Sequence, residues 1–475
     1  MNLPRITICF ALLGQIFLAG CAVGPNYHAP QPTADAAFAN GAQTNLNTGE
    51  SVATWWRGFN DATLTTIVDR ALTNNYDLRI ADAHLREARA LRRGTQFDLL
   101  PAVSADAGYT DRRLSRVAVS GVTGINRHQE LYDLGFDATW ELDLFGRVRR
   151  SVEAGKAEVQ VAAANRQDVQ VTLISEVARN YFELRGAQNQ LAVARRNAAN
   201  QRETMNITQA RLDGGRGTEL DVARARAQLN STLASIPPLE ASIAHAMHRL
   251  AVLAGEQPAA LVTQLNKPAP LPALPALVAI SSPESLLRRR PDVRAAERYL
   301  AAATARVGVA TGDLFPRVTF NGRLGLEASR LSGLGSAGSD TWSFGPSITW
   351  AALDYGHVRS RIQAAGARAE AALALYQRTV LTTLEETENA LVDFGREQTR
   401  RDFLSESVQA SEIAATLARQ RYENGATDFI TVLDSERVLL DAQDQLARSQ
   451  TRTAVALVAV YKALGGGWEN EAAAP

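Results

Sequence analysis

The feature that most constrains this chain is an internal duplication that carries a proline at the same place in each copy. The segment "DLLPAVSADAGYT" at residues 98–110 returns as "DLFPRVTFNGRLG" at 313–325. Pro101 and Pro316 are separated by as many positions as Asp77 and Asp292, which lie in the Ala- and Arg-rich runs before them. A repeat of this length indicates a duplicated unit and not a short solenoid repeat.

The correspondence continues beyond the prolines. "LDLFGRVR" (142–149) matches "ALDYGHVR" (352–359), which aligns Gly146 with Gly356. The two copies therefore span about 61–255 and 283–466. Within them we predict helices at 61–99, 146–212, 218–255, 283–314, 356–423 and 428–464, and strands at 101–116, 130–144, 316–329 and 341–351.

Proline and glycine mark the predicted junctions between helix and strand. Pro101 and Pro316 cannot donate to a helical ladder and disfavour helical geometry in the residue before them, so each helix should stop there. Gly146 and Gly356 lie where the second strand of each copy returns to a helix, a place that favours unusual backbone angles.

The predicted strands alternate apolar and polar side chains. The pattern runs from Leu134 to Leu142 and again from Trp342 to Trp350, with aromatic residues near the ends. Strands of about ten residues with this alternation are typical of membrane β-barrels. A half-buried sheet in a soluble sandwich would alternate too, but the chain offers no further strands for a second sheet.

The central helices are unusually long. From Val358 to Phe394, apolar or small residues recur with the 3.6-residue period of an amphipathic helix. The helical stretches at about 148–212 and 358–422 would each be about 95 Å long at 1.5 Å per residue. Such lengths call for side-by-side helix packing, since no compact domain needs them.

The N-terminus has the pattern of an exported lipoprotein. Arg5 precedes a short apolar run, and the small residues Ala19 and Gly20 stand directly before Cys21. We predict a signal peptide at 1–20, cleavage before Cys21 and acylation of Cys21, which would place the protein at a membrane. The alternative is an ordinary secretory peptide. The only other cysteine is Cys9, so the body of the chain can hold no disulfide or Cys-based metal site.

Composition excludes several classes of function. Lys plus Arg and Asp plus Glu both total 50, which gives no electrostatic case for a nucleic-acid partner. His245 and His248 could share a helix face, but no third metal ligand is near in sequence. Glu385, Glu386 and Glu388 fit a solvated helix better than an acid–base pair. We therefore predict no catalytic residue, no cofactor and no metal.

Two glycine-containing turns end the long helices. They are "DGGRG" (213–217) and "ENG" (423–425), and new helices begin at Thr218 or Thr427. These turns are expected to be hairpin tips. Further along, Thr431 and Asp434 have the three-residue spacing of a capping arrangement. The same Asp434 could instead face a pore, and the spacing does not decide between the two.

Together these segments resemble the outer membrane factor family of Gram-negative bacteria, the TolC-like proteins, and within it the OprM/NodT lipoprotein branch. The resemblance rests on "CAVGPNYHAP", "TWWRGFNDATLTTIVDRALTNNYDLRIA", the Pro and Gly junctions, "FITVLDSERVLLDAQDQLARSQ" and "ALGGGW". It implies a mainly α fold with a membrane β-barrel: a homotrimer with four strands per protomer in a 12-stranded barrel, continued as a long periplasmic α-helical cylinder.

The resemblance also implies function and location. The chain would be the passive exit duct of a tripartite efflux or export system in the outer membrane. A periplasmic adaptor and an inner-membrane pump, most often of the resistance-nodulation-division type, would be its partners. Ala22 after Cys21 fits sorting of the lipoprotein to the outer membrane. Residues 21–60 and the Pro-rich 256–282 would form an equatorial belt, although their composition suits linkers equally, and 467–475 would be a tail.

Site residues follow from the same resemblance. Asp434 would ring the periplasmic aperture, where three symmetry copies attract cations, and Ile430 would be a constriction. Thr431 stands where TolC has a second aspartate. Tyr422 and Asp221 would form a latch, although Thr427 and Leu220 replace its polar members. Two other functions stay open: a lipid-anchored coiled-coil scaffold without a pore, and an envelope enzyme, for which no constellation is visible.

Overall fold

The computed structural model describes residues 22–31, 34–41, 46–49, 53–117 and 126–468. The predicted signal peptide at 1–20, Cys21 and most of the tail at 467–475 lie outside them. The chain divides into two compact units. The first contains the described residues up to Gln31 with His84–Ala163 and Ala295–Gln377, and the second contains the remaining described residues.

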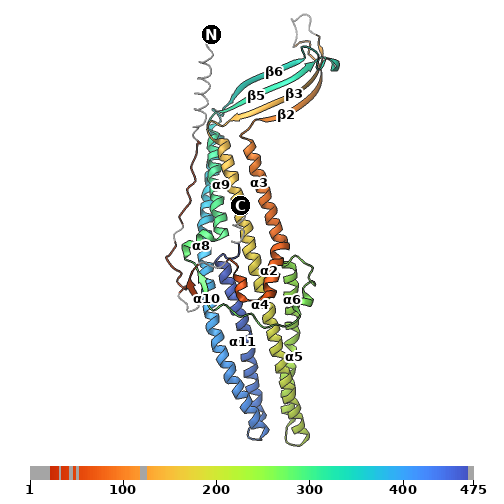
Figure 1. Cartoon of the computed structure of the whole chain (residues 1–475), viewed down its shortest axis with the longest axis vertical. Helices are drawn as coiled ribbons and strands as arrows, with labels where there is room; N and C mark the ends of the chain where they lie inside the picture. The colour runs from red at the N-terminus through yellow and green to blue at the C-terminus, as the bar shows by residue number, and fades with distance from the viewer. Residues whose placement is uncertain (1–21, 32–33, 42–45, 50–52, 118–125, 469–475) are drawn as a thin grey trace. The chain divides into compact units, whose positions relative to one another are not determined.

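The first unit holds a four-stranded antiparallel sheet in the order β2-β3-β5-β6 (Figure 1). The strands are β2 (Ala102–Arg113), β3 (His128–Leu142), β5 (Arg317–Ala328) and β6 (Asp340–Thr349). A short 3-10 helix, η2 (Leu331–Gly333), lies between β5 and β6. Each copy of the duplicated sequence thus supplies one β-hairpin.

The register of this sheet separates apolar from polar side chains. Phe136, Leu324 and Trp342 are direct neighbours across β3, β5 and β6, and all three are exposed. One position along, Asp137 pairs with Arg323. Because successive side chains of a strand point to opposite faces, one face of the sheet is apolar and the other is polar.

Both helices that lead into the sheet end just before a proline. They are α3 (Tyr76–Phe97) and α9 (Pro291–Gly312). At each junction a carbonyl left without a helical donor receives a tryptophan N–H. Trp140 Nε1 donates to the carbonyl of Leu99 and Trp350 Nε1 to that of Leu314, both at 3.0 Å. The duplication therefore repeats the capping bond as well as the proline.

The two junction glycines differ from one another. Gly146 precedes α4 (Arg147–Asp213) and has a φ of +80°, which favours glycine. Gly356 is the second residue of α10 (Tyr355–Glu423) and does not have a positive φ. The expectation of unusual backbone angles at both glycines is therefore wrong for Gly356, because in the second copy the helix has already begun.

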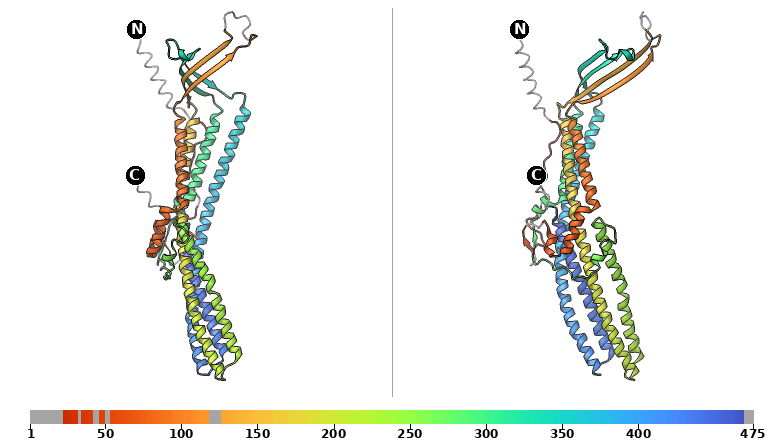
Figure 2. Two further views of the ribbon diagram at one scale, coloured as in Figure 1. Left: turned by 90° about the vertical axis from the view of Figure 1, so that its right-hand side faces the viewer. Right: turned by 45° about the vertical axis from the view of Figure 1, so that its right-hand side comes forward.

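The second unit is mainly helical. It contains α2 (Ala62–Asn74), α5 (Glu219–Ala234), α6 (Ile236–Leu253), α7 (Val262–Leu265), α8 (Pro283–Arg289) and α11 (Phe429–Ala463), with parts of α3, α4, α9 and α10. Figure 2 shows α4, α5, α10 and α11 side by side within this unit. None of the helices that the structure describes is both long enough and apolar enough to cross a membrane.

An aromatic cluster is the centre of the second unit's core. Trp55 of η1 (Trp55–Phe59) stacks on Tyr461 with ring centroids 4.9 Å apart, and Phe59 meets Phe182 edge to face at 4.8 Å. Trp55 and Phe182 are almost fully buried. The core therefore joins the segment before the first repeat to helices from both copies.

Three predicted helices are each two helices. The helix predicted at 61–99 breaks at Asn75, whose Oδ1 accepts from the amides of Asp77 and Leu78 and so caps α3. The helix predicted at 218–255 breaks at Ser235, before "IPP". The helix predicted at 283–314 breaks at Arg290, since Pro291 disfavours helical geometry in the residue before it.

The two segments whose composition suits linkers pair with each other. β1 (Leu46–Thr48) and β4 (Val278–Ile280) form a parallel two-stranded sheet. Leu261 and Leu265, from the Pro-rich 256–282, are almost fully buried in the second unit's core. These segments are thus packed parts of the unit rather than free tethers.

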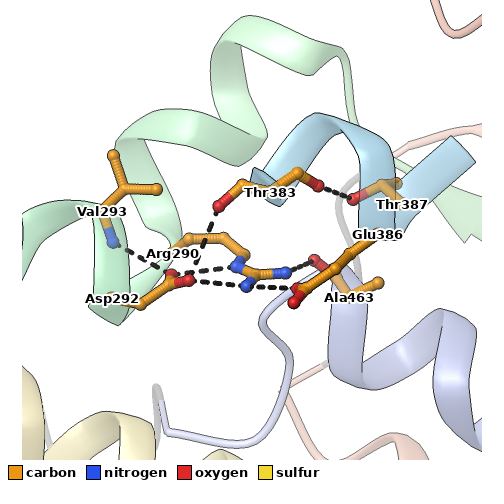
Figure 3. Close-up of polar contacts among 7 residues, drawn as sticks. All are labelled: Arg290, Asp292, Val293, Thr383, Glu386, Thr387 and Ala463. Carbon is orange, nitrogen blue, oxygen red and sulfur yellow. Dashed lines mark hydrogen bonds and ion pairs between the residues drawn. The ribbon is translucent and has the colours of Figure 1, made fainter. Parts of the chain in front are cut away.

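A buried guanidinium joins three elements of the second unit (Figure 3). Arg290 donates to both carboxylate oxygens of Asp292 at 2.9 and 2.6 Å, to Glu386 of α10 at 2.9 Å, and to the carbonyl of Ala463 at 2.9 Å. A cation at the last turn of α11 also complements the helix dipole. Burial opposes the charge, but Asp292 and Glu386 outweigh it and raise the pKa of Arg290.

Asp168 lines a cavity of about 330 Å³ beside this network, with Arg290, Glu386, Asp393 and Lys462 among apolar residues. Burial, reinforced by the negative charge of Asp292, raises the pKa of Asp168 above its ordinary value of 3.8. The neighbouring cations Arg290 and Lys462 oppose the shift only in part. The folded chain therefore binds this proton more tightly than the unfolded chain does.

We predict that Trp140→Phe and Trp350→Phe each lower the thermal stability of the purified protein. Each change removes one hydrogen bond and leaves a carbonyl unsatisfied, at a cost of about 0.5–1.5 kcal/mol. Trp342→Phe is the matched control, because Trp342 is exposed on the same sheet. Thermal melts followed by circular dichroism measure the effect. Equal melting temperatures for all three variants would contradict a role for the capping bond.

We predict that Asp168→Asn stabilises the protein at neutral pH. A carboxyl group whose pKa is raised on folding loses stability as pH rises from its unfolded pKa through its folded pKa. The variant should therefore melt higher than wild type above this window, and the gap should close below about pH 4. Asp402→Asn, at an exposed position of α10, is the control. A gap that persists unchanged at low pH would show that Asp168 acts by packing alone.

Candidate functional site

The two long helical hairpins end in turns of the same design. Gly215 has a φ of +70° and Gly425 one of +74°. At the first tip the amides of Gly215 and Arg216 donate to the carbonyls of Leu212 and Arg211, and the second tip repeats both bonds from Gly425 and Ala426. This is the Schellman ending of a helix, which turns the chain back sharply.

The helices that leave the tips begin differently. Thr218 caps α5: its hydroxyl accepts from the amide of Asp221 at 3.2 Å and donates to the Asp221 carboxylate at 2.7 Å. At the second tip Asp428 is the N-cap of α11 and its side chain makes no capping bond. Asp221, predicted as part of a latch, therefore has a local role in starting α5.

Ile430, Thr431 and Asp434 lie on one exposed face of α11. Phe429, Val432 and Glu436 are buried on the other side of the helix. Asp434 Oδ1 accepts from Arg437 at 3.0 Å, and this pair is exposed. The three predicted pore residues are therefore on the side of α11 that is not packed against the rest of the second unit.

The capping alternative for Thr431 and Asp434 is wrong. Thr431 is the third residue of α11 and not its cap, and its hydroxyl is 3.2 Å from that of Thr427. A capping box needs its first residue outside the helix, where the amides of the first turn still lack acceptors. Asp434 therefore takes no part in capping α11.

Tyr422 is buried, but it contacts a residue that sequence reasoning missed. Its ring packs against Phe429, and the Arg211 guanidinium lies 4.2 Å from the ring centroid. Arg211 Nη1 also donates to the carbonyl of Tyr422 at 3.0 Å. Among the described residues, Tyr422 and Asp221 make no hydrogen bond to each other, and Arg211 is the residue that binds Tyr422 across the two hairpins within a chain. A Tyr422–Asp221 bond to a neighbouring copy stays a prediction.

A second missed residue is Glu436. Its side chain is only 8% exposed, and one carboxylate oxygen accepts from Arg419 Nη2 of α10 at 2.6 Å and from Thr204 Oγ1 of α4 at 3.0 Å. Glu436 also lines a polar cavity of about 500 Å³ between these helices. Glu436 follows Phe429 and Val432 in the apolar stripe of α11, and this position was the sequence signal that its side chain is buried. No sequence signal indicated its partners.

The structure describes the segment next to the predicted lipidation site from Ala22 onward. The amide of Val23 donates to the carbonyl of Phe145 at 3.0 Å, and Arg150 donates to the carbonyl of Val23 and to Asn26 Oδ1. Ala22 lies against Gly146 so closely that an added Cβ would be 2.5 Å from the Ala22 Cα. Residue 22 is thus fixed at the strand-to-helix junction, and Cys21 itself lies outside the described residues.

The described residues place no group of three or more His, Cys, Asp or Glu side chains where they could hold a metal ion. Their polar clusters at the tips join hairpins to one another.

Comparison with known proteins decides the family. The family model described as "Outer membrane efflux protein" matches residues 67–256 and 282–466, one match for each copy of the duplication. The chain belongs to the outer membrane efflux protein family. It is an outer-membrane channel of the kind that serves tripartite efflux systems, as the fold and the resemblance predicted.

Individual members of the efflux family are similar over nearly the whole chain. Nodulation protein T of Rhizobium leguminosarum bv. trifolii is 32% identical, covering 100% of both chains. The toluene efflux pump outer membrane protein TtgI of Pseudomonas putida is 33% identical, covering 97% of each. The solved outer-membrane channel OprN is 46% identical with a TM-score of 0.90, covering 94% of this chain and 100% of that one.

We predict that Glu436→Gln loosens the tips. The change removes the negative charge that pairs with Arg419 and should cost about 1.5–3 kcal/mol of local stability. Amide hydrogen exchange of residues 427–440 should become faster, since local opening there needs less free energy. Glu406→Gln, at an exposed position of α10, is the control. Exchange as slow as in wild type would contradict the role given to this ion pair.

Proposed function

We propose that the chain is the passive exit duct of a tripartite efflux system, that it works as a homotrimer, and that its gate is at the helical tips. It would bind a periplasmic adaptor and an inner-membrane pump of the resistance-nodulation-division type, and carry out no enzymatic turnover. The pump would set which solutes pass.

The sheet is the observation that carries this proposal. Its order β2-β3-β5-β6 leaves β2 and β6 as open edges, and one of its faces is apolar and exposed. Four strands cannot close a barrel, and open edges are not found in lipid. Three copies joined edge to edge would give 12 strands, remove every edge and turn the apolar face toward lipid.

A lipid anchor fits the same arrangement. Residue 22 is held against Gly146, at the end of the sheet where the strands give way to helices. Residue 22 directly follows the predicted lipidation site in the sequence. Acyl chains on Cys21 would then enter the membrane beside the strands. This supports lipidation of Cys21 over the secretory-peptide alternative.

The gate proposal rests on the two faces of α11. Ile430, Thr431 and Asp434 would line the aperture, while Glu436 and the Arg211–Tyr422 contact hold the hairpins together behind it. The Tyr422 hydroxyl has no hydrogen-bond partner among the described residues of its own chain, so it is free to bond Asp221 of a neighbouring copy. Such a bond could yield when an adaptor docks.

We predict that the purified, lipidated protein conducts ions in a planar bilayer and that two substitutions at the tips change the current. Tyr422→Phe should enlarge the small wild-type openings, because it removes only the hydroxyl that would bond a neighbour. Asp434→Ala should reduce cation preference, because it removes the three symmetry-related carboxylates that would surround the pore axis of the trimer. Asp402→Ala, at another exposed aspartate beside an arginine, is the control.

The outcomes separate the parts of the proposal. Currents indifferent to both substitutions would keep the duct and refute this gate. No conductance from a correctly reconstituted protein would favour a scaffold without a pore. In cells, deletion of the gene should raise retention of at least one pump substrate, and unchanged retention across a broad panel would count against the duct itself.

A further inference from the structure

One guanidinium on the polar face of the sheet is surrounded by three carboxylates. Arg323 of β5 lies 3.0 Å from Asp106 of β2, and 3.5 and 3.3 Å from Asp133 and Asp137 of β3. We call these four residues the Arg323 cluster. They come from both copies of the duplicated sequence, and they meet only because β3 and β5 are neighbours.

Glycines make room for the Arg323 cluster. Gly135 and Gly325 pair directly between β3 and β5, and a Cβ added at Gly135 would be 3.7 Å from Arg323 Nη2. The guanidinium therefore lies across β3 and reaches Asp106 on the strand beyond. A Cβ added at Gly108 would be 2.5 Å from Asp133 Oδ1. Gly108 therefore leaves the space that the Asp133 carboxylate occupies.

The polar face that carries the cluster must face the pore. Its opposite face presents Phe136, Leu324 and Phe344, all exposed, and only that face can meet hydrocarbon. Charged side chains in the membrane section of a barrel line its water-filled interior. In a closed trimer, three copies of the Arg323 cluster would therefore surround the channel axis.

The charges in the cluster do not balance. Like charges side by side on a sheet are destabilising, so Arg323 is needed to hold the carboxylates together. One carboxylate would be enough to neutralise Arg323 and fix the register, yet three are present. Glu327, directly opposite Asp133 in the register, adds a further exposed carboxylate to the same face. Stabilisation of the sheet does not account for this excess.

We propose that the Arg323 cluster is a charge filter in the membrane section of the channel, which favours cations, and that Arg323 sets its strength. Each copy carries a net charge of two negatives, because three carboxylates face one guanidinium. The ligand class is cations in transit, from small metal ions to cationic solutes. The proposal rests on the proposed trimeric duct, but not on the gate at the helical tips.

The test measures ion selectivity and block in planar bilayers. All variants carry Asp434→Ala, so that the tip carboxylate does not contribute. The readouts are the reversal potential in a KCl gradient and the half-blocking concentration of hexaamminecobalt(III), added to each compartment in turn. Arg323→Gln should increase cation preference and lower the half-blocking concentration about tenfold, since one more negative charge per copy attracts a trivalent ion.

Charge-matched variants separate charge from structure. Arg323→Lys keeps the charge and should behave like the parent. The double variant Arg323→Gln/Asp137→Asn restores the net charge of two negatives and should also return to the parental values. The triple variant Asp106→Asn/Asp133→Asn/Asp137→Asn should lose cation preference, because Arg323 then faces only Glu327. Arg288→Gln, at an exposed arginine of α8, is the matched control. Heat-resistant trimers on gels establish that each variant is assembled.

Selectivity that follows net charge across these variants would support the filter. Unchanged selectivity in assembled Arg323→Gln and triple-variant trimers would overturn it and leave the duct intact. A double variant that behaves like Arg323→Gln alone would also overturn it, because loss of structure and not of charge would then be the cause. Absence of any current from the parent would instead refute the proposed duct.

Discussion

The structure depends on one constraint: a hydrogen-bonded sheet in lipid can have no free edge. Four strands with an apolar face and two open edges are not a stable membrane element alone. The chain contributes a third of a closed structure in the proposed trimer, so its sheet face, its anchor and its helices make sense only with other copies present. The exposed aromatic residues of the sheet follow from the same constraint.

In the helical part of the chain, polar side chains connect the long helices to one another. Arg290 connects the start of α9 to α10 and to the end of α11, Glu436 connects α4, α10 and α11, and Arg211 connects the two tips. Long helices rich in alanine pack with narrow apolar stripes, which alone specify register weakly. A buried ion pair with fixed geometry is costly to misalign, because a slipped register would leave a charge without its partner.

Much of this architecture could be predicted from the sequence, because it depends on local chemistry. Pro101 and Pro316 predict where the helices before them end, and the alternation of apolar and polar residues from Leu134 to Leu142 predicts a strand. Asn75 and Arg290 show the limit: both helix breaks lie inside segments rich in helix-forming residues, although Pro291 marks the second of them. Arg211 was missed because Tyr422 is more than 200 positions away in sequence, and Glu436 because its partners Thr204 and Arg419 lie on other helices; no local pattern encodes such contacts. The expectation for Gly356 was wrong because, with Gly146 and Gly356 aligned, the helix of the second copy begins two residues earlier than that of the first.

The two copies of the repeat also differ in a way that has consequences for symmetry. A tryptophan caps the helix end in each copy, Trp140 in the first and Trp350 in the second. A trimer would therefore approximate a ring of six equivalent units. The segment after Cys21 contacts both copies but covers only one of the two strand-to-helix junctions: Ala22 rests on Gly146, while nothing lies within 4 Å of a Cβ added at Gly356. Alternate positions around the ring are therefore chemically distinct. In such a ring, the two kinds of junction would differ in whether the residues after Cys21 cover them.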